Sequence, residues 1–347
     1  MNRRTFLLGS ASLALGVRET WAAGGTDDAA KLVQSQVDAK ELSGAVLHLR
    51  QGQHVTERAF GLAKAESVFY LASITKPMTA TAAMILADRG KLSLEDQVQK
   101  YLPEFTGADR EKVLVRHLLT HTSGLPDMLP ENEALRQRHA PLKEFVAIAC
   151  RTPLLFAPGT RTAYQSSGIL LAGEIVERVS GKSLADFLKS EIFEPLGMKS
   201  SSVGLGGRKL EDTMQLQRDA ATDWAQNSPY WRNLGAPWGS VHATAADVGR
   251  FVDYFVKPEP AILKPATAAA MITDQNKGVS RPWGIGWSLG SGFGKNASAR
   301  TYGHSGSSGV LVWLDPEKDF HCVLLTTLPA SFSQRTLLQP VADLLPG

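Results

Sequence analysis

The chain has 347 residues, of which 43% are hydrophobic and 20% are charged, and its formal net charge is +3. This length and composition predict a globular protein with an ample core, and so small a net charge gives no indication of a nucleic-acid partner. No apolar run reaches the length of about 20 residues that a membrane-spanning helix requires.

The first residues resemble a twin-arginine export signal. Arg3 and Arg4 are followed by a short, weakly hydrophobic stretch and then by small residues at 22–24, where cleavage would occur. We therefore predict a signal peptide over residues 1–23 and a mature domain over 24–347, exported in its folded state to the periplasm.

The predicted elements indicate an α+β fold with strands near both ends of the chain. A helix over 27–42 precedes a hairpin of strands 44–50 and 54–61. Helices are then predicted over 78–89, 142–151, 168–180 and 183–193, with short ones after Ser93 and Val113. Strands are predicted over 283–289, 310–314 and 320–327, and a last helix over 334–345. This order predicts one antiparallel sheet built from the N- and C-terminal strands, flanked by helices, with a mainly helical lobe inserted at roughly 76–234.

A Ser-x-x-Lys pattern lies between an extended apolar run and a helical one. This places Ser73 at a helix N-terminus with Lys76 on the same face one turn later, and Pro77 suits the first turn. A hydroxyl is a weak nucleophile until a base removes its proton, and a buried lysine can be that base because desolvation lowers its pKa. Alone, the pattern is also that of a capped helix start with an exposed lysine.

Two later clusters carry further candidate groups. Tyr164 and Ser166 stand in a loop just before a helix, where a phenol near two cations can act as general acid or base. In Gly303–Ser307, which leads into a strand, Gly306 would let a substrate backbone approach the strand edge, and the N–H of Ser307 could donate to an oxyanion. A packed tyrosine and an edge hairpin without a catalytic role are the structural alternatives.

Together the three clusters resemble a known family. Ser-x-x-Lys at 73–76, Tyr-x-Ser at 164–166 and His-x-Gly at 304–306 have the order and spacing of the class C β-lactamase-related serine hydrolases. This family includes penicillin-binding DD-peptidases, class C β-lactamases, esterases and amidases. The resemblance covers nearly all of the mature chain and implies a β-lactamase/DD-peptidase-like fold. Framework similarity extends over 115–125, 239–248 and 303–325.

The resemblance implies a role for each site residue. Ser73 is similar to the acylated nucleophile, and Lys76 and Tyr164 are similar to the pair that activates it and shuttles protons. The backbone N–H groups of Ser73 and Ser307 resemble an oxyanion hole. The implied reaction is attack by Ser73 on a carbonyl carbon, formation of an acyl-enzyme, and hydrolysis of that intermediate by water.

Two positions depart from the β-lactamase pattern. The Asn of Tyr-x-Asn, which contacts the substrate's amide, is replaced by Ser166, which has one hydroxyl instead. In His304-Ser305-Gly306, a histidine that is largely neutral near pH 7 stands where class C β-lactamases have the Lys of Lys-Thr-Gly. Because a β-lactam carboxylate favours a cation, these changes favour small esters or amides, and His-x-Gly is also compatible with D-Ala-D-Ala peptides.

Three hypotheses for function follow. The first is hydrolysis of an ester, amide or β-lactam bond through acyl-Ser73. The second is a D-Ala-D-Ala carboxypeptidase, or a penicillin-recognising or peptidoglycan-binding protein with little turnover. The third is an α/β-hydrolase esterase using Ser288 of the Gly-x-Ser-x-Gly at 286–290, but a Gly/Ser loop follows where that nucleophile elbow needs a helix.

The remaining chemistry-bearing residues are interpreted as structural. His117 and His121 have metal-ligand spacing, but their helix lacks the Glu of a zinc protease, so we predict neither a metal nor a cofactor. Cys150 and Cys322 are interpreted as buried small hydrophobes. The expected partner is a small-molecule or peptide acyl substrate, and its cell-wall origin and the oligomeric state stay open. Either cleft lining or core packing would explain the tryptophans at 224, 231 and 238.

Overall fold

The computed structural model describes residues 23–259, 261–279 and 281–346. Nearly all of the predicted signal peptide lies outside these ranges, so that assignment stays a prediction. The helix predicted after it is α1 (Ala23–Asp38), which begins and ends four residues earlier than expected.

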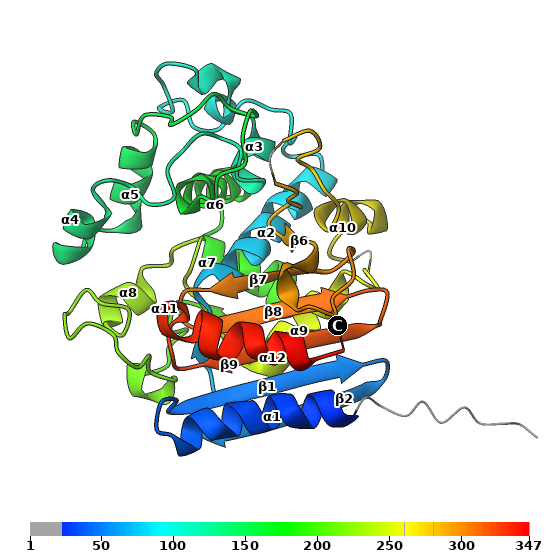
Figure 1. The fold of residues 1–347 in the computed structure, drawn as a ribbon. Helices are drawn as coiled ribbons and strands as arrows, with labels where there is room; N and C mark the ends of the chain where they lie inside the picture. The colour runs from blue at the N-terminus through cyan, green and yellow to red at the C-terminus, as the bar shows by residue number, and fades with distance from the viewer. Residues whose placement is uncertain (1–22, 260, 280, 347) are drawn as a thin grey trace, which may run out of the picture.

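A six-stranded antiparallel sheet forms the base of the fold (Figure 1). Its order is β2-β1-β9-β8-β7-β6, so the N-terminal hairpin pairs directly with the C-terminal strands, with Ala45 opposite Thr326. This confirms the predicted sheet built from both termini. The strands are β1 (Gly44–Gln51), β2 (His54–Gly61), β6 (Ser288–Leu289), β7 (Tyr302–Gly306), β8 (Val310–Asp315) and β9 (Phe320–Thr326).

Alternation along the strands divides the side chains between two cores. Leu47 on β1 and Leu324 on β9 pack against α1 and against α11 (Ala330–Ser333) and α12 (Gln339–Leu344) at the C-terminus. Val46 and Val323, one residue along each strand, face α9 (Ala245–Tyr254) in the larger core. Because both faces are covered, β8 and β9 are buried along their whole length.

The helical lobe lies over one edge of the sheet, and α2 (Thr75–Asp88) runs between the two (Figure 1). Residues 75–86 of α2 are all buried, as expected for a helix that is apolar on every side. Gly90, with a φ of 68°, ends the helix as predicted. No helix in the described ranges is long and apolar enough to cross a membrane. The lobe also contains α3 (Val115–Leu119), α4 (Asn132–Gln137), α5 (Leu142–Ala149), α6 (Ser166–Ser180), α7 (Leu184–Leu188) and α8 (Pro229–Asn233).

Some elements differ from the predictions. The helix expected after Ser93 is a side-chain-stabilised turn followed by one 3-10 turn, Val98–Lys100. The strand expected over 283–289 shortens to β6, because Gly286 has a φ of 81° and packs against α2, where a Cβ would lie 2.6 Å from that of Ala80. The helices α4, α8, α9 and α10 (Pro265–Met271) and the strand β7 were not predicted. A small sheet of β3 (Phe69–Tyr70), β4 (Ser202–Val203) and β5 (Val241–Ala243) was not predicted either, although the run that contains β3 was expected to be extended.

Both cysteines are free thiols buried in different cores. Burial raises the pKa of the Cys150 thiol to about 12 and that of Cys322 well above its ordinary value. Protonated, buried thiols of this kind behave as small apolar groups, which confirms the interpretation from sequence.

Candidate active site

Ser73 lies in a 3-10 turn (Ala72–Ile74) immediately before α2, at the helix N-terminus where the sequence predicts it. The backbone of Ala72 has a φ of 44°, a left-handed conformation that strains any residue other than glycine. The turn is held by a hydrogen bond from the N–H of Leu71 to the carbonyl of Val241 on β5. The fold thus fixes the serine at a sharp, strained corner between β3 and α2.

Lys76 is the nearest base to Ser73. A 2.8 Å hydrogen bond joins Lys76 Nζ to Ser73 Oγ, and Nζ also lies 3.3 Å from the carbonyl oxygen of Trp238. The side chain is fully buried, and this desolvation lowers the pKa of Lys76 to about 7, although the charge of Asp127 opposes the shift. A large fraction of Lys76 is therefore a neutral amine at neutral pH, able to take the serine proton.

Tyr164 completes the group around the serine hydroxyl. It lies just before α6, its ring centroid is 4.7 Å from Lys76 Nζ, and it lines the same cleft as Ser73. Burial raises the pKa of Tyr164 well above its ordinary value. Of the two groups that the sequence offers as bases, the lysine is therefore the one able to accept a proton, and the tyrosine is a neutral phenol suited to donate one.

The strand β7 forms the opposite wall of the cleft. Ser305 and Ser307 are exposed and line the cleft together with Ser73 and Tyr164. Within the described chain the N–H of Ser307 donates to no other group, whereas its carbonyl accepts the N–H of Ala330. The N–H of Ser307 is thus free to donate to an oxyanion, as the sequence suggests.

Gly306 has a structural role that was not expected. A Cβ at this position would lie 2.5 Å from the carbonyl oxygen of Leu71 and 2.6 Å from the Cγ2 of Val310. The missing side chain therefore lets β7 approach the chain's own turn at Ser73, and the approach of a substrate backbone at Gly306 stays a prediction.

Replacing Gly306 by alanine should push β7 away from the Ser73 turn and lower kcat by roughly tenfold or more, with a loss of about 1–3 kcal/mol in the free energy of unfolding. Steady-state kinetics and thermal unfolding measure both effects. Gly292→Ala is the matched control, since a Cβ there meets nothing within 4 Å. Equal effects of the two substitutions would contradict the close-approach argument.

His304 lies behind Tyr164 on the buried face of β7. The two ring centroids are 6.0 Å apart, and His304 Nδ1 donates to the carbonyl of Ser305 at 2.7 Å. Burial, with a contribution from the charge of Lys76, lowers the pKa of His304 to about 3. The side chain is therefore neutral at physiological pH and supplies no cation for a substrate carboxylate.

Aromatic residues also line the cleft. Trp231 and Trp238 line it and are also core residues, each 6% exposed, so both alternatives for them hold. The Trp231 indole donates to the Tyr70 hydroxyl at 2.9 Å, and the Arg136 guanidinium lies 3.9 Å from the Trp231 ring centroid. Trp224 is not among the residues that line the cleft, but its carbonyl accepts a 2.8 Å hydrogen bond from Arg136, which does line it.

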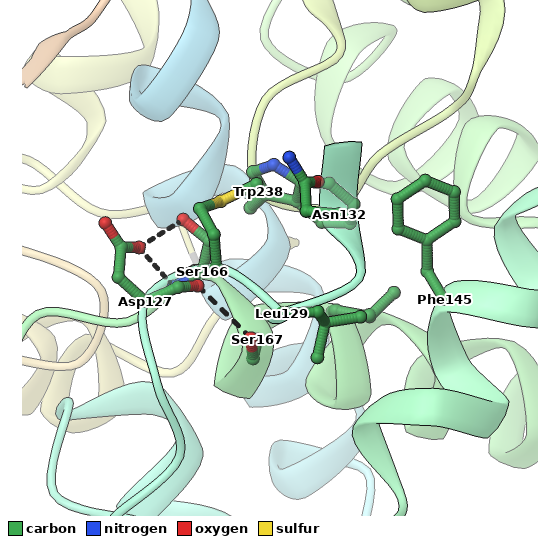
Figure 2. A pocket seen from close by; sticks show the side chains of 9 residues that line it. Asp127, Leu129, Asn132, Phe145, Ser166, Ser167 and Trp238 are labelled. Carbon is green, nitrogen blue, oxygen red and sulfur yellow. Dashed lines mark hydrogen bonds between the residues drawn. The ribbon is translucent and has the colours of Figure 1, made fainter. Parts of the chain in front are cut away.

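Two charged residues of this cleft, Asp127 and Arg136, were not among the predicted site residues. Asp127 Oδ1 accepts hydrogen bonds from the backbone N–H and the hydroxyl of Ser166, at 2.9 and 2.8 Å (Figure 2). The Ser166 hydroxyl, which replaces the side-chain amide of the Tyr-x-Asn pattern, is thus already hydrogen-bonded to the Asp127 carboxylate. The one available signal was position, because Asp127 directly follows the framework stretch 115–125 and a proline.

The other candidates from sequence lie apart from this arrangement. His117 Nδ1 accepts the N–H of Leu114, and His121 Nδ1 accepts that of Gln165, so both imidazoles have structural roles. Burial lowers the pKa of His117 to about 4. Ser288 pairs with Gly303 in the sheet, and a 3-10 turn follows β6, so the strand–turn–helix of a nucleophile elbow is not formed.

A serine at a helix N-terminus that is hydrogen-bonded to a buried lysine, with a protonated tyrosine in the same cleft, is the arrangement expected of a serine hydrolase that works by covalent catalysis. Comparison with known proteins agrees with this class. A profile of the family described as Beta-lactamase matches residues 29–344, and the chain belongs to that family.

The relatives in this family have several activities. Penicillin-binding protein 4 of Amycolatopsis lactamdurans is 32% identical over 290 residues, which cover 78% of this chain and 72% of that protein. Esterase EstB of Burkholderia gladioli is 35% identical over 184 residues, 46% of this chain and 47% of the esterase. The solved structure of EstCE1, a hydrolase with promiscuous acyltransferase activity, matches with a TM-score of 0.78 over 94% of this chain and 99% of that one. At 22% identity the last likeness shows the fold alone.

Proposed function

We propose that this protein is an exported hydrolase that cleaves an ester, amide or β-lactam bond through an acyl-enzyme on Ser73. The observation that carries the proposal is the 2.8 Å hydrogen bond between Ser73 Oγ and a fully buried Lys76 whose pKa is about 7. Esters and amides are the favoured substrates, because the neutral His304 offers no cation to a β-lactam carboxylate.

In the proposed reaction, Lys76 Nζ takes the proton of Ser73 Oγ as that oxygen attacks the carbonyl carbon. The N–H groups of Ser73 and Ser307 donate to the oxyanion that forms. When the bond to the leaving group breaks, the Tyr164 hydroxyl donates its proton to that group and recovers one from the Lys76 ammonium. A water molecule then attacks the acyl carbon, and release of the acid restores Ser73.

Periplasmic delivery by the twin-arginine route is part of the proposal. It is supported by Arg3, Arg4 and the small residues at 22–24. A cell-wall-derived acyl donor would be available in that compartment.

Mass spectrometry tests the proposal directly. The wild type and Ser73→Ala are each incubated with a β-lactam, an activated ester and a D-Ala-D-Ala peptide. The wild type should gain the mass of an acyl group and release product, and Ser73→Ala should do neither. Ser288→Ala, which removes the alternative nucleophile, should retain turnover.

Two results would contradict the proposal. Product formed at the wild-type rate by Ser73→Ala would exclude Ser73 as the nucleophile. A stable β-lactam adduct without turnover of any probe would favour a penicillin-recognising protein instead of a hydrolase.

A further inference from the structure

The cleft beside Ser73 contains a carboxylate that the proposed reaction does not use. Asp127 is exposed and lines the cleft with Ser73 and Ser166. Its Oδ1 is bound by Ser166, but its Oδ2 has no hydrogen-bond or ion-pair partner among the residues that the structure describes. Figure 2 shows this second oxygen directed away from Ser166.

The carboxylate is held rigidly and close to the catalytic groups. The backbone N–H groups of Ser166 and Ser167 also donate to the Asp127 carbonyl, each at 3.0 Å, which fixes the residue at the N-terminus of α6. Asp127 lines the same cleft as Ser73 and Tyr164, and its charge opposes the lowering of the Lys76 pKa by burial. A ligand group bound at Oδ2 would therefore belong to the part of a substrate that lies in this cleft beside Ser73.

A small hollow adjoins the cleft at this point (Figure 2). It shares Asp127, Met128, Ser166 and Trp238 with the cleft, and it has room for about one water-sized group. The amide oxygen of Asn132 is buried at this hollow and has no hydrogen-bond partner within the described ranges. Like Asp127 Oδ2, it is an acceptor without a donor. The hollow is also lined by the apolar side chains of Leu129, Phe145 and Leu170 and by the polar Ser167.

The polarity at this position is the reverse of the Tyr-x-Asn pattern. An Asn amide can donate a hydrogen bond to a neutral substrate. Here the Ser166 hydroxyl donates its hydrogen bond to Asp127, so the group that the cleft presents to a substrate is the anionic carboxylate, which is an acceptor. Hydrogen bonds in which the donor or the acceptor is ionised are about twice as strong as those between neutral groups. A free carboxylate oxygen here therefore favours a cation over a neutral donor.

We propose that the enzyme selects acyl donors whose acyl part carries a protonated primary amine, such as small amino acid esters or amides, and that Asp127 binds the ammonium group. The adjoining hollow accommodates a substituent no larger than a methyl group. This inference rests on the acyl-enzyme function proposed above and names its substrate class.

The test compares three methyl esters by the methanol they release. Alanine methyl ester carries the ammonium, methyl isobutyrate replaces it with a methyl group, and N-acetylalanine methyl ester keeps an N–H without the charge. Both enantiomers of the alanine compounds are used. The wild type should prefer alanine methyl ester over isobutyrate in kcat/KM by roughly 10- to 100-fold, the range expected for a hydrogen bond between charged groups.

Asp127→Asn should reduce this preference to about threefold or less, because its amide can still accept from Ser166 but has no charge for the ammonium. The measured quantity is the ratio of two kcat/KM values in one variant, which cancels the effect of Asp127 on Lys76. Glu131→Gln, the same chemical change at a nearby exposed position outside the cleft, is the matched control and should keep the wild-type ratio.

The outcomes separate this inference from the proposed function. Two results would overturn the inference alone while turnover still depends on Ser73. One is that methyl isobutyrate or the N-acetyl ester has the same kcat/KM as alanine methyl ester. The other is that the preference for alanine methyl ester is unchanged in Asp127→Asn. Calorimetry on Ser73→Ala gives a readout without turnover, and alanine methyl ester should bind there more tightly than isobutyrate. If this difference in affinity disappears when Asp127→Asn is added, while the wild type hydrolyses none of the esters, the ammonium site is supported and the proposed hydrolysis is contradicted.

Discussion

Lys76→Met should lower kcat/KM by about three orders of magnitude or more while leaving Ser73 in place. Methionine has a similar length and no basic nitrogen, so the serine hydroxyl loses the hydrogen-bonded neighbour whose pKa, about 7, suits a base. In the wild type, kcat/KM should rise with pH and level off above about pH 7, as Lys76 becomes neutral. A pH–rate profile of ester hydrolysis measures both effects.

The same substitution should stabilise the fold, which excludes misfolding as the cause of lost activity. In the unfolded chain Lys76 has a pKa near 10.5, and burial lowers it to about 7 in the folded state. Between these values the folded state binds fewer protons, so stability due to Lys76 increases with pH across this window and is lowest at pH 7 and below. Methionine has no charge to desolvate, so Tm at pH 7 should increase.

Lys143→Met, at an exposed position, controls for the chemical change itself. It should alter neither the pH profile nor the rate. A Lys76→Met enzyme that kept more than about a tenth of its activity would exclude Lys76 as the base.

Tyr164→Phe should reduce kcat by about 10²- to 10⁴-fold, the usual contribution of a positioned acid, and the loss should depend on the leaving group. The ring and its 4.7 Å contact with His121 are retained, so only the hydroxyl is removed. An alkyl alcohol or amine must be protonated as it departs, whereas 4-nitrophenolate needs no proton. We therefore expect a large loss with alkyl esters or amides and a small loss with 4-nitrophenyl esters.

The pH profile provides a second criterion for Tyr164. Its raised pKa means that Tyr164 stays protonated over the pH range in which the enzyme is assayed. The rise of kcat/KM near pH 7 should therefore persist unchanged in Tyr164→Phe. Disappearance of this rise would assign the base to Tyr164 instead of Lys76. Tyr254→Phe, whose hydroxyl bonds only to backbone groups of Glu259 and Leu263 in the described chain, is the matched control.

Much of the fold could be predicted because its signals are local. The hairpin of β1 and β2, the start of α2 near Pro77 and its end at Gly90 follow from turn chemistry and helix capping. β6 was overpredicted because the sequence around Gly286 is apolar, whereas its conformation is decided by contact with α2. Strands as short as β3, β4 and β5 have too few residues to show an alternating pattern.

The candidate site was predictable only in part, for a related reason. Ser73, Lys76 and Tyr164 were named because they sit in motifs, although their meeting around one hydroxyl depends on tertiary structure. Asp127 and Arg136 lie in a loop and on a helix of six residues, and neither position has a local pattern that indicates a cleft. The packing of Gly306 against Leu71 was not predicted, because the two residues lie far apart in the chain.

The pairing of β1 with β9 determines when during synthesis the protein can become active. Ser73 and Lys76 lie in the first quarter of the 347-residue sequence and are synthesised early, but β7 and the β9 strand that completes the sheet lie in its last seventh. Such long-range pairing folds slowly, since a large loop must close before any contact compensates its entropy. An unfinished chain therefore holds the serine and lysine without the Ser307 wall of the cleft, and hydrolytic activity is confined to completed, folded molecules.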